Sequence, residues 1–204
     1  MKNNREYRNF TDIQVRADEN EKMVVEGYAT VFDTPYTLYD DGDYIVREQI
    51  ARNAFEFTDM SDVIMQYDHR GRVFARNKNG TLQIVPDERG LKTIADLSGT
   101  DIGRQLYQEI DGGYTDKMSF GFTISSESRE VISAEGEPIT VLRTITGIKK
   151  LYDVSAVSIP ANDATEISAR SYCDGVIAEV KAERQRAEHI KLMRKKLKVM
   201  MLGD

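Results

Sequence analysis

Two histidines occur in this chain of 204 residues, and they restrict where acid–base chemistry near neutral pH could take place. His69 ends a segment of alternating apolar and polar residues, whereas His189 lies among charged residues. Imidazole is the side chain best suited to move a proton in this pH range. We therefore take His69 as the candidate base and His189 as a solvated helix position. A hydrogen-bonded structural histidine at a strand end is the alternative interpretation of His69.

A hydrolase that uses this base also needs a nucleophile, and Ser119 is the best-placed hydroxyl. The alternation within 114–125 puts Ser119 on the face opposite to Met118 and Phe120. Gly121 shares the face of the serine and, having no side chain, would leave room for a substrate backbone. We therefore expect a reachable hydroxyl at an accessible rim. An ordinary strand serine is the alternative.

Asp153 is the candidate for the acid that orients the imidazole. It lies within an apolar segment, 151–159, where a carboxylate is costly unless it is paired. A strand-end aspartate bonded to a backbone amide is the alternative role. Two other acids rank lower. Strand alternation points Asp68 away from His69, and Asp116 lies near the start of the serine strand, on its core side.

The elements that must position these side chains are mostly strands. Apolar and polar residues alternate from about 12 to 159, and turn-forming clusters divide this region into hairpins expected at 13–32, 81–97 and 129–148. Short helices are predicted at 48–57 and at 101–110, the second capped by Thr100. Seven or eight strands with one or two helices predict a mainly β (α+β) fold, as a small barrel or a folded sheet.

The C-terminal region differs from the rest in charge and in period. From Val176 onward there are eight basic and four acidic side chains, although the whole chain has a net charge of −6. Ile190, Met193, Leu197 and Met200 recur at helical spacing. This pattern predicts a basic amphipathic helix appended to the domain, with boundaries of 1–170 for the domain and 171–204 for the tail.

Composition excludes several classes of function. The negative net charge gives no field that would favour nucleic acid or anionic lipid. No apolar run approaches the ~20 residues that span a bilayer, and the first ten residues lack an apolar signal core, so we expect neither export nor membrane insertion. The single cysteine, Cys173, cannot close an internal disulfide, and the few His and Cys residues suit zinc poorly. We expect no metal, no cofactor and a reducing compartment.

Five segments, taken in order, resemble the prohead (procapsid maturation) proteases of tailed bacteriophages, which are fold relatives of the herpesvirus assemblins. The segments are Glu26–Phe32 (EGYATVF), Asp68-His69, Asp87 with Gly90-Leu91, Ser119–Phe122 (SFGF), and Asp153–Val157 (DVSAV) followed by Pro160-Ala161-Asn162. Together they extend over about residues 24 to 165.

This resemblance implies a serine endopeptidase with His69 as the base, Ser119 as the nucleophile and Asp153 as the orienting acid. It implies a small closed or partly open antiparallel β-barrel, assemblin-like, with flanking helices. It also suggests oxyanion-binding amides near 160–162. Many relatives have Glu where this chain has Asp153, which is one methylene shorter.

The same resemblance implies the substrates: a scaffolding protein or the scaffolding segment of the major capsid protein, and the protease itself. Its place would be the host cytoplasm, inside the assembling procapsid, where self-cleavage could remove the tail 171–204. A homo-oligomer is possible. Two alternatives are an inactive scaffold-like protein of the procapsid interior, and a peptide-binding module that adds a strand beside Gly121.

Overall fold

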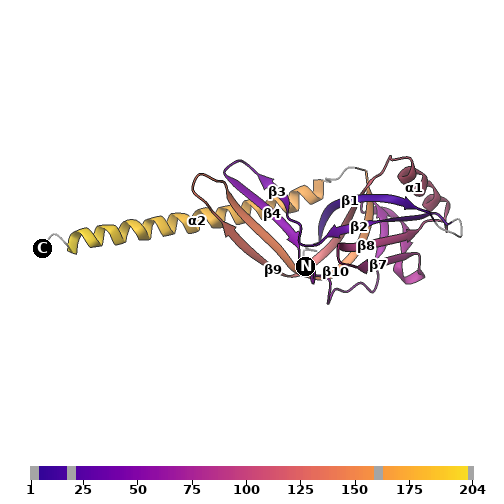
Figure 1. Cartoon of the computed structure of the whole chain (residues 1–204), viewed down its shortest axis with the longest axis horizontal. Coiled ribbons are helices and arrows are strands. Elements are labelled where there is room, and N and C mark those ends of the chain that lie inside the picture. The colour runs from indigo at the N-terminus through magenta and orange to yellow at the C-terminus, as the bar shows by residue number, and fades with distance from the viewer. Residues whose placement is uncertain (1–4, 18–21, 159–162, 202–204) are drawn as a thin grey trace.

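The computed structural model describes residues 5–17, 22–158 and 163–201. Strands form the main body of the molecule, and one long helix extends away from them (Figure 1). The strands are β1 (Glu6–Arg16), β2 (Val24–Val31), β3 (Tyr36–Asp40), β4 (Tyr44–Ile50), β5 (Ile64–Tyr67), β6 (Arg70–Arg76), β7 (Leu82–Pro86), β8 (Gly90–Asp96), β9 (Lys117–Ile132) and β10 (Ile139–Val157). The helices are α1 (Asp101–Asp111), α2 (Asp163–Met201) and a short 3₁₀ turn (Asn77–Asn79).

The strands form one open, mixed sheet. Its hydrogen-bonded order is β3-β4-β10-β9-β1-β2-β8-β7, and β5 joins β10 and β6 off this path. Strand β10 has β9 along one edge, while β4 and then β5 pair with it in parallel along the other. The prediction of a mainly β chain with helices is confirmed. Of the closed or partly open antiparallel barrel that was predicted, the closed form is wrong, and two strand pairings are parallel. Alternation locates strands without fixing which edges pair.

Two apolar clusters hold the sheet and helices together. The larger one lies between the strands and α1, and Phe120 and Phe122 stack at its centre with their ring centroids 4.5 Å apart. The smaller one packs the first half of α2 onto β4 and β10 through Cys173, Val176, Ile177 and Val180. Burial of these side chains is the main favourable contribution to folding. The sheet that carries β9 and β10 is therefore supported by both clusters.

One predicted helix is wrong. Residues 44–50 form strand β4, whose buried positions Val46, Glu48 and Ile50 recur every second residue. Glu48 has no exposed surface and belongs to a buried network of ion pairs. The rest of the predicted segment, 52–57, forms consecutive turns. The helical spacing of Ile50, Ala54 and Phe57 favoured a helix there, but Phe57 is exposed and does not share a buried face with the other two.

The two other helices are confirmed. Thr100 caps α1 by accepting a hydrogen bond from the backbone amide of Gly103 at 3.1 Å. Helix α2 is continuous, and its C-terminal part projects away from the strands (Figure 1). Several apolar side chains in this projecting part are half exposed or more, namely Ile190, Leu192, Met193, Leu197 and Met200. Among the described residues, no helix is long and apolar enough to cross a membrane.

Candidate active site

The structure brings together the three side chains that the sequence singled out. The Nδ1 atom of His69 lies 2.5 Å from Oδ1 of Asp153, and its Nε2 atom lies 2.6 Å from Oγ of Ser119. Their positions in the chain are far apart: His69 follows β5, Ser119 lies on β9 and Asp153 lies on β10. One imidazole therefore joins a carboxylate to a hydroxyl.

The pairing register of β9 and β10 explains why the serine and the acid share a face. Ser155 lies opposite Ser119, and Asp153 lies opposite Gly121. Side chains two residues apart on a strand point the same way, so Ser119, Asp153 and Ser155 all project from one side of this strand pair. The apolar Phe120 and Val154 between them point into the other side and are fully buried.

His69 lies in a tight turn. Strand β5 ends at Tyr67, which pairs with Arg70, and the two residues between them, Asp68 and His69, have φ values of 47° and 58°. Two positive φ values are typical of the type I′ turns that join hairpin strands. Asp and His tolerate this region better than most residues, but each costs about 1–3 kcal/mol. The sequence predicted a strand up to His69, so the direction of its ring could not be derived from alternation.

Asp68 holds this turn in place and does not contact the imidazole. Its backbone amide donates to the carbonyl of Ala156, and its carboxylate accepts from the backbone amide and the hydroxyl of Ser158, each at 3.0 Å. These bonds fasten the turn to the end of β10. Asp116 is an exposed acid 3.6 Å from Nζ of Lys117. Neither of the lower-ranked acids reaches the ring.

Asp153 is fully buried and accepts hydrogen bonds from three donors. Oδ1 accepts from His69 and, at 2.8 Å, from the hydroxyl of Ser155, while Oδ2 accepts from the guanidinium of Arg5. An ionised carboxylate can only accept, so Nδ1 of His69 carries the hydrogen in this arrangement. The other nitrogen, Nε2, then accepts from the hydroxyl of Ser119. This is the arrangement in which the imidazole can take the serine proton.

Two further residues at the site, Arg5 and Tyr7, were not predicted, and Ser155 was predicted only as the second choice of nucleophile. The Tyr7 ring packs on the His69 ring with centroids 4.3 Å apart, and burial raises the pKa of the Tyr7 phenol. Arg5 and Ser155 bind Asp153. Ser155 lies two residues after Asp153, and this spacing predicts that both side chains share one face of the strand. No sequence pattern placed Arg5 and Tyr7 at the site, because the predicted first strand did not extend that far.

Two expectations about access to the serine are wrong, and so is the alternative of strand addition beside Gly121. Ser119 has no exposed surface, so its hydroxyl does not lie at an open rim. The space beside Gly121 is filled: a Cβ there would lie 2.5 Å from Oδ2 of Asp153 and 2.8 Å from Cε1 of Tyr7. Strand β9 also pairs with β1 on one edge and β10 on the other, so no edge is open at Gly121 for strand addition. Alternation predicts the face of a side chain but not what covers it.

A cavity of about 470 Å³ lies beside the turn that carries His69, between the β5–β6 hairpin and α1. Its lining includes Asp68 and Arg70, the two neighbours of His69, together with the apolar side chains of Phe74 and Leu106. The segment 160–162, where oxyanion-binding amides were expected, lies outside the described residues. Across the described chain, no cluster of three or more His, Cys, Asp or Glu side chains could hold a metal ion.

The sequence matches one family of known proteins over most of its length. The family model described as caudovirus prohead serine protease matches residues 11–176, a range that contains His69, Ser119 and Asp153. The chain is also similar to the "Prohead protease" of Enterobacteria phage HK97, with 26% identity over 167 residues that cover 81% of this chain and 68% of that protein. No solved structure matches significantly. Because the family model covers most of its length, the chain belongs to the caudovirus prohead serine proteases.

Proposed function

We propose that this serine protease is an endopeptidase whose catalytic residues are Ser119, His69 and Asp153. The observation that carries the proposal is the double contact of one imidazole, with Asp153 on Nδ1 and Ser119 on Nε2. An inactive scaffold-like protein is the alternative. Activity is supported by the intact hydrogen bonds that connect the three side chains. It is also supported by the strained backbone at His69, because such strain is common at functional sites.

In the proposed mechanism, Oγ of Ser119 attacks the carbonyl carbon of a peptide bond while Nε2 of His69 takes the hydroxyl proton. The C–N bond then breaks, and His69 returns the proton to the leaving amine. Water attacks the resulting ester, again with His69 as the base, and releases the acid and the serine. The Asp153 carboxylate stabilises the imidazolium that forms in each half of the cycle and keeps the ring oriented.

We propose phage procapsid proteins as the substrates: a scaffolding protein or the scaffolding segment of the major capsid protein, and the chain itself. The family description and the name of the HK97 relative support this class. The place of action would be inside the assembling procapsid, in the host cytoplasm. An assemblin-like arrangement of the strands stays a prediction, which an experimental structure would test.

The division into a protease domain, 1–170, and a basic tail, 171–204, also stays a proposal. The first part of the tail contributes Cys173 and Val176 to the smaller apolar cluster, which includes Val141 of β10. Removal of the tail by self-cleavage would expose that side of β10. Mass spectrometry of the chain from mature particles would show whether 171–204 is lost.

Co-expression with the major capsid protein of the same phage tests the function. We expect the wild-type chain to trim the capsid protein and the Ser119→Ala variant to leave it intact. Ser128→Ala is the matched control, because Ser128 is an exposed serine on the same strand. Trimming that persists in Ser119→Ala would move the nucleophile elsewhere, with Ser155 the next candidate.

A further inference from the structure

We propose that Arg5 is a positioning residue of the protease, which holds the Asp153 carboxylate against His69 from the side opposite to the imidazole. The inference rests on the proposed roles of His69, Ser119 and Asp153, and it adds the residue that immediately precedes β1 to that set.

The two oxygens of Asp153 have different partners. Oδ1 accepts from His69 and from Ser155, so it is already occupied by two donors. Oδ2 accepts from Nη2 of Arg5, and this contact is also an ion pair. Asp153 has no exposed surface. Without Arg5, Oδ2 would be left buried with no charged donor, which is costly for a carboxylate.

The Arg5 guanidinium lies in an aromatic cradle. Its central carbon is 4.3 Å from the centroid of the Tyr152 ring and 5.3 Å from that of Tyr7. The side chain is 23% exposed, so most of it is buried against these rings and against Asp153. Such packing restricts the guanidinium to a few orientations. The ion pair is therefore rigid, unlike an exposed one.

Gly121 makes this approach possible. It lies directly opposite Asp153 in the β9–β10 pair and opposite Tyr7 in the β1–β9 pair. A Cβ at this position would lie 2.9 Å from Nε of Arg5 and 2.5 Å from Oδ2 of Asp153. Any side chain at residue 121 would thus push into the ion pair. The space beside Gly121, where a substrate backbone was expected, is filled by the side chains of Arg5 and Asp153.

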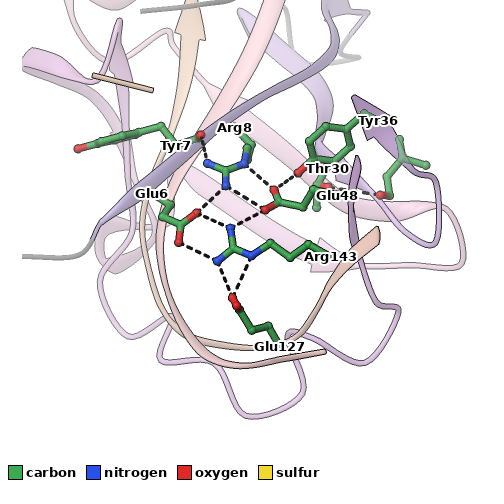
Figure 2. A network of polar contacts seen from close by, with 9 residues as sticks. Glu6, Tyr7, Arg8, Thr30, Tyr36, Glu48, Glu127 and Arg143 are labelled. Atoms are coloured by element: carbon green, nitrogen blue, oxygen red, sulfur yellow. Dashed lines mark hydrogen bonds and ion pairs between the residues drawn. The ribbon is translucent and has the colours of Figure 1, made fainter. Parts of the chain in front are cut away.

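The alternation of β1 explains how Arg5 is delivered to the site. Arg5 and Tyr7 face the site, whereas Glu6 and Arg8 face the buried network on the other side of the strand. In Figure 2 the Tyr7 ring points away from that network, while its carbonyl accepts from Arg8. Arg8 binds Glu48 through two hydrogen bonds, at 2.5 and 3.0 Å. The network anchors the strand whose other face carries Arg5.

The expected consequence concerns the chemical step. A guanidinium on Oδ2 keeps Oδ1 in line with Nδ1 of His69, and the ring then presents Nε2 to Ser119. Loss of Arg5 leaves the substrate contacts unchanged and loosens the base. We therefore expect a lower rate of bond formation at Ser119 and unchanged binding of a ligand before that step.

The test uses the full chain and a fluorophosphonate, which forms a covalent bond with an activated serine. We expect Arg5→Met to reduce the maximal labelling rate at Ser119 by about 10- to 100-fold, with the half-saturating probe concentration unchanged. Arg5→Lys, which keeps the charge, should restore part of the rate. Arg16→Met is the matched control, because Arg16 lies on the same strand and pairs with the partly exposed Glu26.

Two further measurements separate positioning from folding. The low-field proton NMR signal of the His69 Nδ1–H should broaden or shift in Arg5→Met and in Gly121→Ala, and persist in Arg16→Met. The proposal is overturned if Arg5→Met labels as fast as the wild type, if Arg16→Met is equally slow, or if this signal is the same in all variants. Absence of labelling at Ser119 in the wild type would instead overturn the proposed function itself.

Discussion

Two fully buried carboxylates, Asp153 and Glu48, have very different surroundings although the same two strands supply partners to both. Arg5, which immediately precedes β1, binds Asp153, and Arg8 within β1 binds Glu48. Strand β10 carries Asp153 itself and also Arg143, which binds Glu48. The two strands lie on either side of β9, which pairs with both. The two sites therefore share one sheet, and their differences show what would separate the proposed catalytic carboxylate from a structural one.

The partners of Glu48 are Arg8, Arg143 and Tyr36, and none of them changes its protonation near neutral pH. Burial acts to raise the pKa of Glu48, but Arg8 and Arg143 more than offset this, so its pKa lies below the ordinary value. Burial acts to lower the arginine pKa values, yet the carboxylates Glu48 and Glu6 raise them. Tyr36 adds a hydrogen bond, and burial raises its pKa well above normal (Figure 2).

Asp153 differs because one of its three partners is the imidazole of His69, a type of group that can exchange protons near neutral pH. The same imidazole also contacts the Ser119 hydroxyl through Nε2. Burial and an arginine are common to both sites. The comparison teaches that the identity of the third partner, rather than burial or charge, distinguishes the carboxylate proposed to be catalytic from the structural one.

The largest expected effect comes from removing the charge of Asp153 without changing its shape. Asp153→Asn should lower the turnover rate by about 10⁴-fold, because an amide does not hold His69 in the tautomer that accepts the serine proton. The rate is measured by capsid-protein trimming or by fluorophosphonate labelling. Asp116→Asn, at an exposed acid, is the control. A reduction of less than tenfold would place the orienting group elsewhere.

The corresponding change at Glu48 should affect stability. Glu48→Gln removes the negative charge that pairs with the buried guanidinium groups of Arg8 and Arg143. We therefore expect a loss of about 3–5 kcal/mol in the free energy of unfolding. Urea denaturation measures it. Glu127→Gln should have a much smaller effect, below about 1 kcal/mol, because the Glu127 side chain is 38% exposed. Equal losses for the two variants would show that Glu48 is not the centre of the network.

The contribution of Glu48 should also depend on pH. Its pKa in the folded chain is lowered from the ordinary value of 4.5, so its stabilising effect is complete above pH 4.5. It should decrease as the pH falls below that value and vanish once the pH passes the folded-state pKa. The difference in unfolding free energy between wild type and Glu48→Gln, measured from pH 7 downward, checks this. A difference that grows on acidification would contradict the ion-pair network.

The smallest expected effect concerns Cys173, which packs near this network. Burial is the main cause that raises the pKa of its thiol to about 11, and the charge of Glu48 adds to the shift. Near pH 8 the thiol should react with a disulfide reagent about 100-fold more slowly than an exposed cysteine. Glu48→Gln should increase the rate modestly. Rapid labelling of the wild type would mean that α2 does not stay packed on β10.

The comparison also shows which parts of the molecule the sequence could predict. His69, Ser119 and Asp153 stood out because polar side chains with catalytic chemistry interrupt otherwise apolar strands. Glu48 also interrupts an apolar strand, but the spacing of Ile50, Ala54 and Phe57 favoured a helix over this segment, so its place in the sheet was not predicted. Arg5 precedes the patterned region, so its role depends on a pairing with β9 that no local signal predicts.

The most direct test of the central claim is the site of covalent labelling. The full chain is treated with a fluorophosphonate, digested, and mapped by mass spectrometry, in parallel with a His69→Ala variant. We expect the label on Ser119 in the wild type and its loss in His69→Ala. Labelling of Ser155 instead, or labelling of Ser119 at the same rate without His69, would contradict the proposal that this imidazole activates Ser119.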